Sequence, residues 1–251
     1  MHIRSYQKRF QTIYRKTYRQ LLILLFILSM IGQPLAAQDD SATYRVTFEG
    51  TWSADSPHPH PEGADGFPGN AHFSPLIGAV HSADIIFWEP GGLATSGVET
   101  VAELGVTGDL RAEVEAEIAN GTTLALLSGP DVSPSPGIAL IEDVQVTTEY
   151  PLITLLTMIA PSPDWFIGVS GLSLMGENGW ENEVIVELHG YDAGTEDGIA
   201  FSLGNDATSP HEPIQTLSET ILGKFTFTRT DANEGEGEEN DLKVYLPLIR
   251  R

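Results

Sequence analysis

Apolar and polar residues alternate along several stretches of this chain, which is the pattern of half-buried β-strands. The clearest cases are Tyr44, Val46 and Phe48 and, later in the chain, Val184, Val186 and Leu188. Further strands are expected from shorter apolar runs at residues 85–88, 139–146, 152–159, 166–174 and 224–228. The run at 152–159 is apolar nearly throughout, which predicts a central strand covered on both faces.

Helical periodicity is confined to two segments. Leu110, Val114 and Ile118 form one stripe, and Asn120 followed by Gly121 predicts the end of a helix over residues 109–120. A shorter helix is expected over 98–104. Residues 53–70 are rich in proline and glycine and predict a long surface loop. Many short strands, Pro/Gly-rich connections and one or two short helices predict an all-β fold, an antiparallel β-sandwich.

The first 37 residues have the pattern of a Sec signal peptide. Six basic residues and no acidic residue precede an apolar run at 21–31, and a small-residue cleavage site follows, ending at Ala37. The run is too short for a comfortable membrane span. We therefore expect export with cleavage after Ala37, a secreted or cell-surface protein, and no stable membrane span after cleavage. Leu35, at the −3 position, leaves an uncleaved anchor as the alternative.

The net charge of the chain limits the classes of binding partner that we expect. Six of the 13 basic residues lie in the signal segment, so the rest of the chain carries seven against 35 acidic residues, a formal net charge of −28. Such a surface repels phosphate backbones and attracts cations, so nucleic acid is not an expected partner. The chain has no cysteine and hence no disulfides. We expect one domain over 38–230, a flexible acidic linker over 231–242 and a short apolar tail with basic ends over 243–251.

Carboxylates gather in two turn-forming segments. Asp164 follows Pro161-Ser-Pro163, and the 191–198 segment places three acidic residues among glycines, namely Asp192, Glu196 and Asp197. Carboxylates on rigid loops at one end of a β-domain suit a hard cation, and calcium takes six to eight such oxygen ligands. The alternative from spacing alone is a pair of solvated acidic turns.

Four motifs together resemble the spondin domain, the N-terminal module of F-spondin and mindin, which also occurs alone in bacterial secreted proteins. They are Phe-Glu-Gly-Thr-Trp-Ser at 48–53, the 72–82 segment, Pro-Ser-Pro-Asp-Trp-Phe-Ile-Gly at 161–168 and Tyr-Asp-Ala-Gly-Thr-Glu at 191–196. Their order and spacing match the family over roughly residues 42–229.

This resemblance implies a C2-like antiparallel β-sandwich with a calcium site among loops at one end. It implies a calcium-binding adhesion or recognition module that contacts a cell-surface or matrix protein or glycan, and no catalysis. Carried over by position, the metal ligands are Asp164 and Asp192, with Glu196 contributing. A further acidic ligand is expected before residue 150, where the ungapped match falls on Gln145. Asp143, on the same strand face, is the charged alternative.

Two other uses of these side chains stay open. Four histidines, His58, His60, His72 and His81, fall within a short stretch, and zinc prefers such nitrogen ligands. A secreted metal-dependent hydrolase, using these histidines or the Asp/Glu loops, is therefore the competing function. Trp165 is expected to cap the sandwich beside the metal loop, or else to be exposed for contact with a partner.

Overall fold

Antiparallel strands dominate the computed structural model, which describes residues 39–232 and 243–245. The strands are β1 Ser41–Gly50, β2 His72–Phe73, β3 Ile77–His81, β4 Thr123–Ser128, β5 Gly137–Thr147, β6 Leu152–Ala160, β7 Trp165–Ser173, β8 Met175–Gly176, β9 Gly179–Trp180, β10 Glu183–Asp192, β11 Gln215–Arg229 and β12 Lys243–Tyr245. The helices among the described residues are α2 Ser96–Leu104 and α3 Gly108–Asn120. None of these helices is long and apolar enough to cross a membrane. The predicted signal peptide lies outside the described residues.

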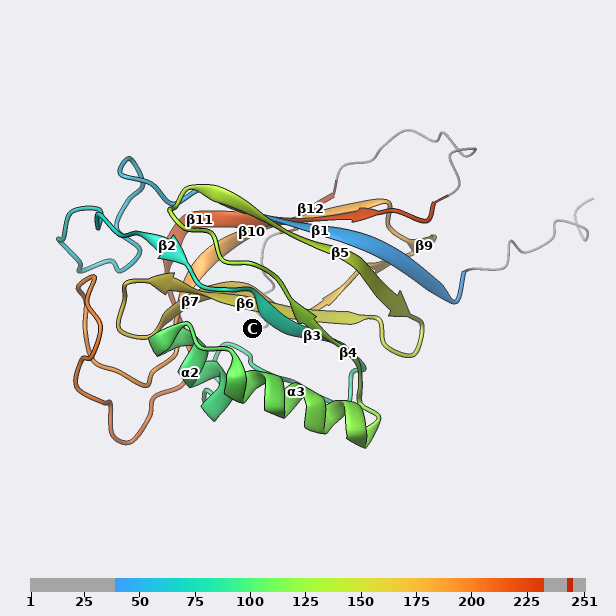
Figure 1. The fold of residues 1–251 in the computed structure, drawn as a ribbon, viewed down its shortest axis with the longest axis horizontal. Helices are drawn as coiled ribbons and strands as arrows, with labels where there is room; N and C mark the ends of the chain where they lie inside the picture. The colour runs from blue at the N-terminus through green and yellow to red at the C-terminus, as the bar shows by residue number, and fades with distance from the viewer. Residues whose placement is uncertain (1–38, 233–242, 246–251) are drawn as a thin grey trace, which may run out of the picture. The chain divides into compact units, whose positions relative to one another are not determined.

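One sheet holds the fold together, with the strand order β4-β3-β6-β7-β10-β11-β1-β5 (Figure 1). Neighbours along this path are antiparallel, whereas β12 joins β10 in parallel and β2 adds to β6. β8 and β9 form a separate two-stranded sheet. The end strands β4 and β5 both line one groove, so the sheet curls until its two edges face each other and is nearly barrel-like.

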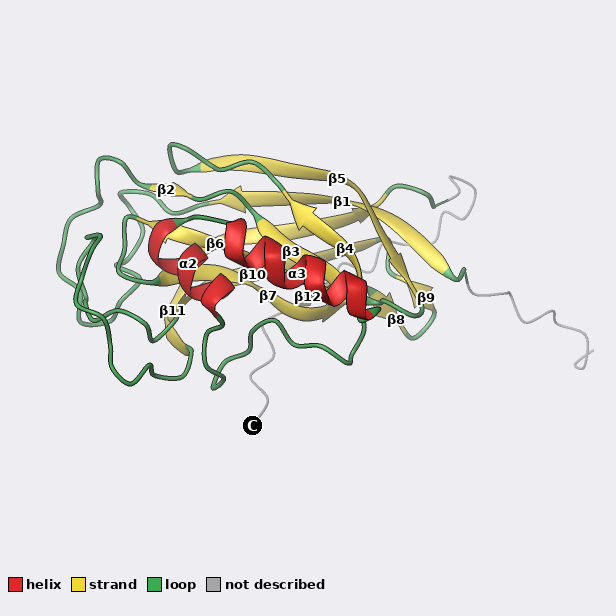
Figure 2. Ribbon diagram, turned by 60° about the horizontal axis from the view of Figure 1, so that its bottom comes forward, coloured by secondary structure: helices red, strands yellow, loops and turns green. Residues whose placement is uncertain are grey.

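Strands β3, β6, β7 and β10 send side chains to two separate hydrophobic clusters on opposite faces of the sheet. In β7, Trp165 and Ile167 belong to the larger cluster, inside the curled sheet, together with Phe48 and Phe225. Phe166, between them, belongs to the second cluster, which lies beneath the helices. Figures 1 and 2 show α2 and α3 lying side by side against strands β3, β6 and β7. Burial on both faces explains why β6 reads as a continuous apolar run, as the sequence predicted.

Most of the predicted elements are present. The helix expected over 109–120 is α3, and the expected shorter helix is α2, capped by the side chain of Thr95 and ended by Gly105 in the left-handed region. The strand expected over 85–88 is wrong, because this segment is a loop whose Phe87 and Trp88 fill the second cluster. The 53–70 segment contains no strand or helix, as expected.

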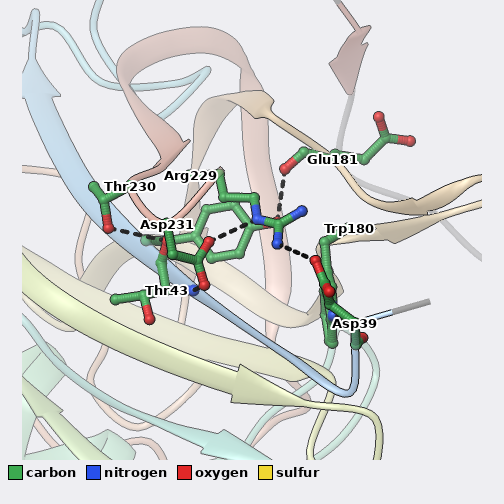
Figure 3. A network of polar contacts seen from close by, with 8 residues as sticks. Asp39, Thr43, Trp180, Glu181, Arg229, Thr230 and Asp231 are labelled. Atoms are coloured by element: carbon green, nitrogen blue, oxygen red, sulfur yellow. Dashed lines mark hydrogen bonds and ion pairs between the residues drawn. The ribbon is translucent and has the colours of Figure 1, made fainter. Parts of the chain in front are cut away.

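A polar network closes the end of the sheet where β1 starts and β11 finishes (Figure 3). Arg229 pairs with Asp39 at 2.8 Å and with Asp231 at 2.7 Å. The second oxygen of Asp231 accepts the backbone N–H of Thr43 at 2.9 Å. Asp231, the first residue of the predicted linker, is therefore held by the domain; residues 233–242 lie outside the described part of the chain.

Candidate functional site

Asp164 stands at the turn between β6 and β7. The turn is held locally, because the Ser162 hydroxyl accepts the backbone N–H of Trp165 at 3.1 Å. The Asp164 side chain is fully buried, as are its neighbours in the Pro-Ser-Pro-Asp motif. The sequence signal here was the placing of a carboxylate in a proline-braced turn, and the structure adds its complete burial.

One oxygen of the Asp164 carboxylate accepts hydrogen bonds, and the other accepts none from the described residues. Oδ2 accepts the backbone N–H of Thr195 at 2.7 Å, the Thr195 hydroxyl at 3.2 Å and the backbone N–H of Glu196 at 3.1 Å. Oδ1 is buried without a partner among the described residues. Burial raises the pKa of Asp164 above its ordinary value, although the three hydrogen bonds to Oδ2 oppose that shift.

Asp192 ends β10 directly beside this turn, where it pairs across the sheet with Trp165. Its Oδ1 accepts the backbone N–H of Gly194 at 2.7 Å. Burial and the nearby Asp164 charge raise the pKa of Asp192 to about 6. The Gly194 hydrogen bond opposes this shift. So does the adjacent indole N–H of Trp165, although it lies outside hydrogen-bonding geometry. A fully buried carboxylate and a half-buried one thus lie near enough for the charge of Asp164 to raise the pKa of Asp192.

Gly194 allows the second loop to fold this tightly. Its φ is +73°, and a Cβ atom there would come within 2.2 Å of the Glu212 carbonyl oxygen. Only glycine fits such a position. The Glu212 N–H donates to the Gly194 carbonyl at 2.8 Å, which closes the loop against the segment leading into β11. Glu212 adds to the negative potential around Asp192.

The side chains of Glu196 and Asp197 differ in their contacts and in their distance from Asp164. The Glu196 carboxylate accepts the side-chain amide of Asn205 at 3.3 Å and is partly exposed beside Asp164. Asp197 is exposed and accepts the Thr208 hydroxyl at 2.7 Å, which ties the loop to itself. Glu196 therefore lies with Asp164, whereas Asp197 stabilises the loop through its hydrogen bond with Thr208.

A fourth carboxylate reaches the cluster from α2, and the sequence did not reveal it. Burial raises the pKa of Glu103, which lies close enough to Glu196 and Asp164 for their charges to raise it further. The nearby Thr195 side chain opposes the shift. Glu103 occurs in an ordinary amphipathic helix, some sixty residues before Asp164, so no local pattern marks it. We refer to Asp164, Asp192, Glu196 and Glu103 as the acidic cluster.

Gln145 and Asp143 are not part of the acidic cluster. Gln145 on β5 pairs with Thr43, at the end of the sheet where β10 begins with Glu183. Asp192 is at the other end of β10, and ten residues of strand span roughly 30 Å. Asp143 is at a bulge in the same part of β5, with φ +56°. The register thus carries both residues away from the cluster, so neither can complete its shell.

The four histidines do not converge either. His58 and His60 pack their rings against Trp165, with centroid distances of 5.8 and 5.7 Å. His81 is buried on β3, where its ring contacts the Thr154 hydroxyl at 2.8 Å. His72 contacts the Asn70 carbonyl. Trp165 itself is fully buried in the larger hydrophobic cluster and pairs with Asp192 across the sheet, so the alternative of an exposed contact residue is wrong.

Among the described residues, no three or more His, Asp or Glu side chains lie so that they could hold a metal ion as they stand. The acidic cluster instead offers a buried, unpartnered oxygen, a second carboxylate with a raised pKa and two partly buried neighbours. Oxygen donors of this kind match the preference of calcium, whose flexible shell accepts backbone carbonyls and water.

The comparisons with known proteins agree with the motifs. Residues 42–224 match the Spondin_N family. The chain belongs to this family. It is 33% identical over 205 residues to human Spondin-2, and 36% identical over 183 residues to chicken Spondin-1. These matches cover 79% and 71% of this chain, but only 60% of Spondin-2 and 22% of Spondin-1. The Spondin_N match includes both loops of the acidic cluster.

Proposed function

We propose that this chain is an exported adhesion or recognition module of the Spondin_N family that binds calcium at the acidic cluster. The observation that carries the proposal is the Asp164 carboxylate. It is fully buried, one oxygen has no partner among the described residues, and Asp192 adds a second charge beside it. A buried charge without a counter-ion is costly, and a bound cation would remove that cost.

Asp164 and Asp192 would be direct ligands in this proposal, and Glu196 and Glu103 would add negative charge around them. Calcium would supply a fixed positive charge that ties the β6–β7 turn, the loop after β10 and the end of α2 to one point. We further infer the C2-like sandwich arrangement for the curled sheet, in which such loops gather at one end. The chain's own part is to hold the two loops through the Asp164 to Thr195 and Asp192 to Gly194 hydrogen bonds.

Apolar side chains beside the cluster support a recognition role. Leu104 follows Glu103 and is 63% exposed, and Leu203, in the loop after Glu196, is 58% exposed. Exposed apolar groups around a polar centre are typical of contact surfaces. We propose that this end of the domain contacts a cell-surface or matrix protein or glycan outside the cell, after cleavage of the signal peptide.

The experiment is thermal unfolding of the exported chain, residues 38–251, in excess calcium and in chelator. Extracellular calcium modules bind with Kd of about 10⁻⁴ to 10⁻³ M, so calcium at a hundredfold excess adds about 2.7 kcal/mol. This raises the melting temperature by roughly 5–10 °C. Magnesium should substitute poorly, because it demands a small octahedral shell.

Asp164→Asn and Asp192→Asn should each abolish most of the calcium response while the domain stays folded in chelator. Asparagine keeps the acceptor for Thr195 or Gly194 but removes the charge. Glu115→Gln, at an exposed position on α3, is the matched control and should respond like the wild type. A full calcium response in both cluster variants would place the ion elsewhere.

A further inference from the structure

The second feature of interest is the groove between the two edges of the sheet. It is open, has a volume of about 490 Å³, and is lined by residues 124–128 of β4 and 141–145 of β5. This volume is within the range of roughly 300–1,000 Å³ typical of ligand sites. The groove is built from two strand edges, whereas the acidic cluster is built from loops and the end of α2.

Both walls carry unpaired backbone. β4 and β5 are consecutive strands and run in opposite directions, yet among the described residues no ladder joins them. They come close just after β4, where a Cβ on Gly129 would come within 2.8 Å of the Ile141 side chain. The open groove lies between residues 124–128 and 141–145. An unpaired strand edge presents N–H and C=O groups that can pair with an added strand.

The sheet already accepts an added strand in another gap. β7 pairs with β10 only over Gly190 to Asp192, and β12 pairs in parallel with Val184 to Val186 farther along the same strand. β12 is a short segment that begins with a lysine and continues with apolar residues. The fold thus accommodates a short strand that begins with a lysine along an edge of β10 that β7 leaves unpaired, while β11 pairs with the other edge.

The charge around the groove favours a cationic occupant. Asp143 is exposed on the groove wall, and no described side chain pairs with it, whereas its neighbour Glu142 is neutralised by Arg45 at 2.8 Å. Neither wall carries a lysine or arginine of its own, and Arg111 of α3 donates to the Ser128 hydroxyl at the end of β4 at 3.4 Å. After the signal segment the chain carries seven basic against 35 acidic residues. A second copy of this acidic chain would be repelled at close approach. A basic segment of another protein would be attracted.

We propose that the β4–β5 groove binds an extended, basic segment of a partner protein as an additional β-strand. Because the two walls run in opposite directions, this strand is antiparallel to one and parallel to the other. Its alternate side chains point either toward the apolar floor at Ile141 and Val144 or toward Asp143. The proposal does not rest on calcium binding, and it assigns Asp143 and Gln145 to partner recognition.

The probes are three synthetic octapeptides tested on the chain from residue 38 to 251. The first alternates lysine with valine or threonine, the second replaces each lysine by glutamate, and the third is the first with alternate backbone nitrogens methylated. Amide hydrogen exchange is measured with and without millimolar peptide, in calcium and in chelator. The lysine peptide should protect residues 124–128 and 141–145 under both conditions, and the other two peptides should not.

Asp143→Asn should weaken the lysine peptide about two- to fivefold, as expected for one exposed charge pair. Asparagine tolerates the positive φ of this position, so the bulge should be kept. Glu115→Gln is again the control and should leave affinity unchanged. The proposal is overturned if neither wall is protected, or if the methylated peptide binds equally well. Sedimentation showing dimers that the lysine peptide dissociates would assign the groove to a second copy instead, and would also overturn it.

Discussion

The backbone N–H of Thr195 donates to the Asp164 carboxylate at 2.7 Å, a bond that joins two loops 31 residues apart in the chain. Asp164 thereby does two things at once. It fastens the loop after β10 to the turn before β7, and it places an ionisable group at a fully buried position. A group with only a fastening role could be an amide, because an amide oxygen accepts the same hydrogen bond. The carboxylate is what makes the cluster a candidate for a cation.

The Thr195 hydroxyl gives a first test of the fastening role. It also donates to Asp164, and Thr195 is 1% exposed. Thr195→Val keeps the shape and removes this donor, so we expect a loss of about 1 kcal/mol in the free energy of unfolding, measured by urea titration in chelator. Thr208→Val removes a similar bond to Asp197 that is exposed to water. It should cost clearly less, and equal costs would argue against a special role for the buried bond.

The pH dependence of stability gives a second test. The pKa of Asp192 is about 6 in the folded chain, against an ordinary value of 3.8. The folded state therefore holds this proton more tightly, so its contribution to stability is fully present below 3.8 and is lost as the pH rises through 6. Without calcium, the free energy of unfolding should fall over that window. The contribution of Asp192 is on the order of 2–3 kcal/mol.

Asp192→Asn should flatten this dependence and should be more stable than the wild type at neutral pH in chelator. Excess calcium should remove the advantage of the variant, because the wild type then gains the ion. Chemical unfolding at a series of pH values, with and without calcium, measures both effects. A wild-type chain whose stability in chelator rises steadily from mildly acidic to neutral pH would contradict the raised pKa.

Much of the fold could be predicted because its patterns are local. The alternation in β1 and β10, the apolar run of β6 and the helix α3 each follow from neighbouring residues. The strand prediction for residues 85–88 was wrong because an apolar run does not distinguish a strand from a loop that packs into the core. Phe87 and Trp88 lie in such a loop and are buried in the second cluster, beneath the helices. Strands β3 and β4 were not predicted: β3 is a short run containing a glycine and a histidine, and β4 directly follows a helix.

The candidate site was predictable only where the family motifs and the turns agreed. Asp164, Asp192 and Glu196 come together because β7 and β10 are neighbours in the sheet. Gln145 was placed by counting residues, but strand register decides which end of the sheet a residue occupies, and counting cannot supply it. Glu103 depends on how α2 packs on β6 and β7, which no sequence pattern encodes.

Gly78 provides a test of the packing between sheet neighbours. A Cβ at this position in β3 would come within 1.9 Å of the Thr154 carbonyl oxygen, a backbone atom that cannot move aside cheaply. Gly78→Ala should therefore cost about 3 kcal/mol or more in the free energy of unfolding. Gly66→Ala, in the long loop where a Cβ meets nothing within 4 Å, is the control and should be nearly neutral. Similar stability of the two variants in urea would show that β3 and β6 are spaced farther apart.

Asp231 tests where the folded domain ends. Although it was assigned to a flexible linker, its carboxylate binds both the Thr43 N–H and Arg229, whose side chain is only 12% exposed (Figure 3). Asp231→Ala should lower the free energy of unfolding by about 1–3 kcal/mol, since it removes two charge-assisted bonds and leaves the Thr43 donor without its partner. Asp55→Ala, an exposed change in the 53–70 loop, should leave stability within about 0.5 kcal/mol of the wild type. Asp231→Asn should be intermediate, because the amide oxygen can still accept one bond while the ion pair is lost. If all three variants unfold at the wild-type urea concentration, Asp231 belongs to the linker and the folded domain ends before it.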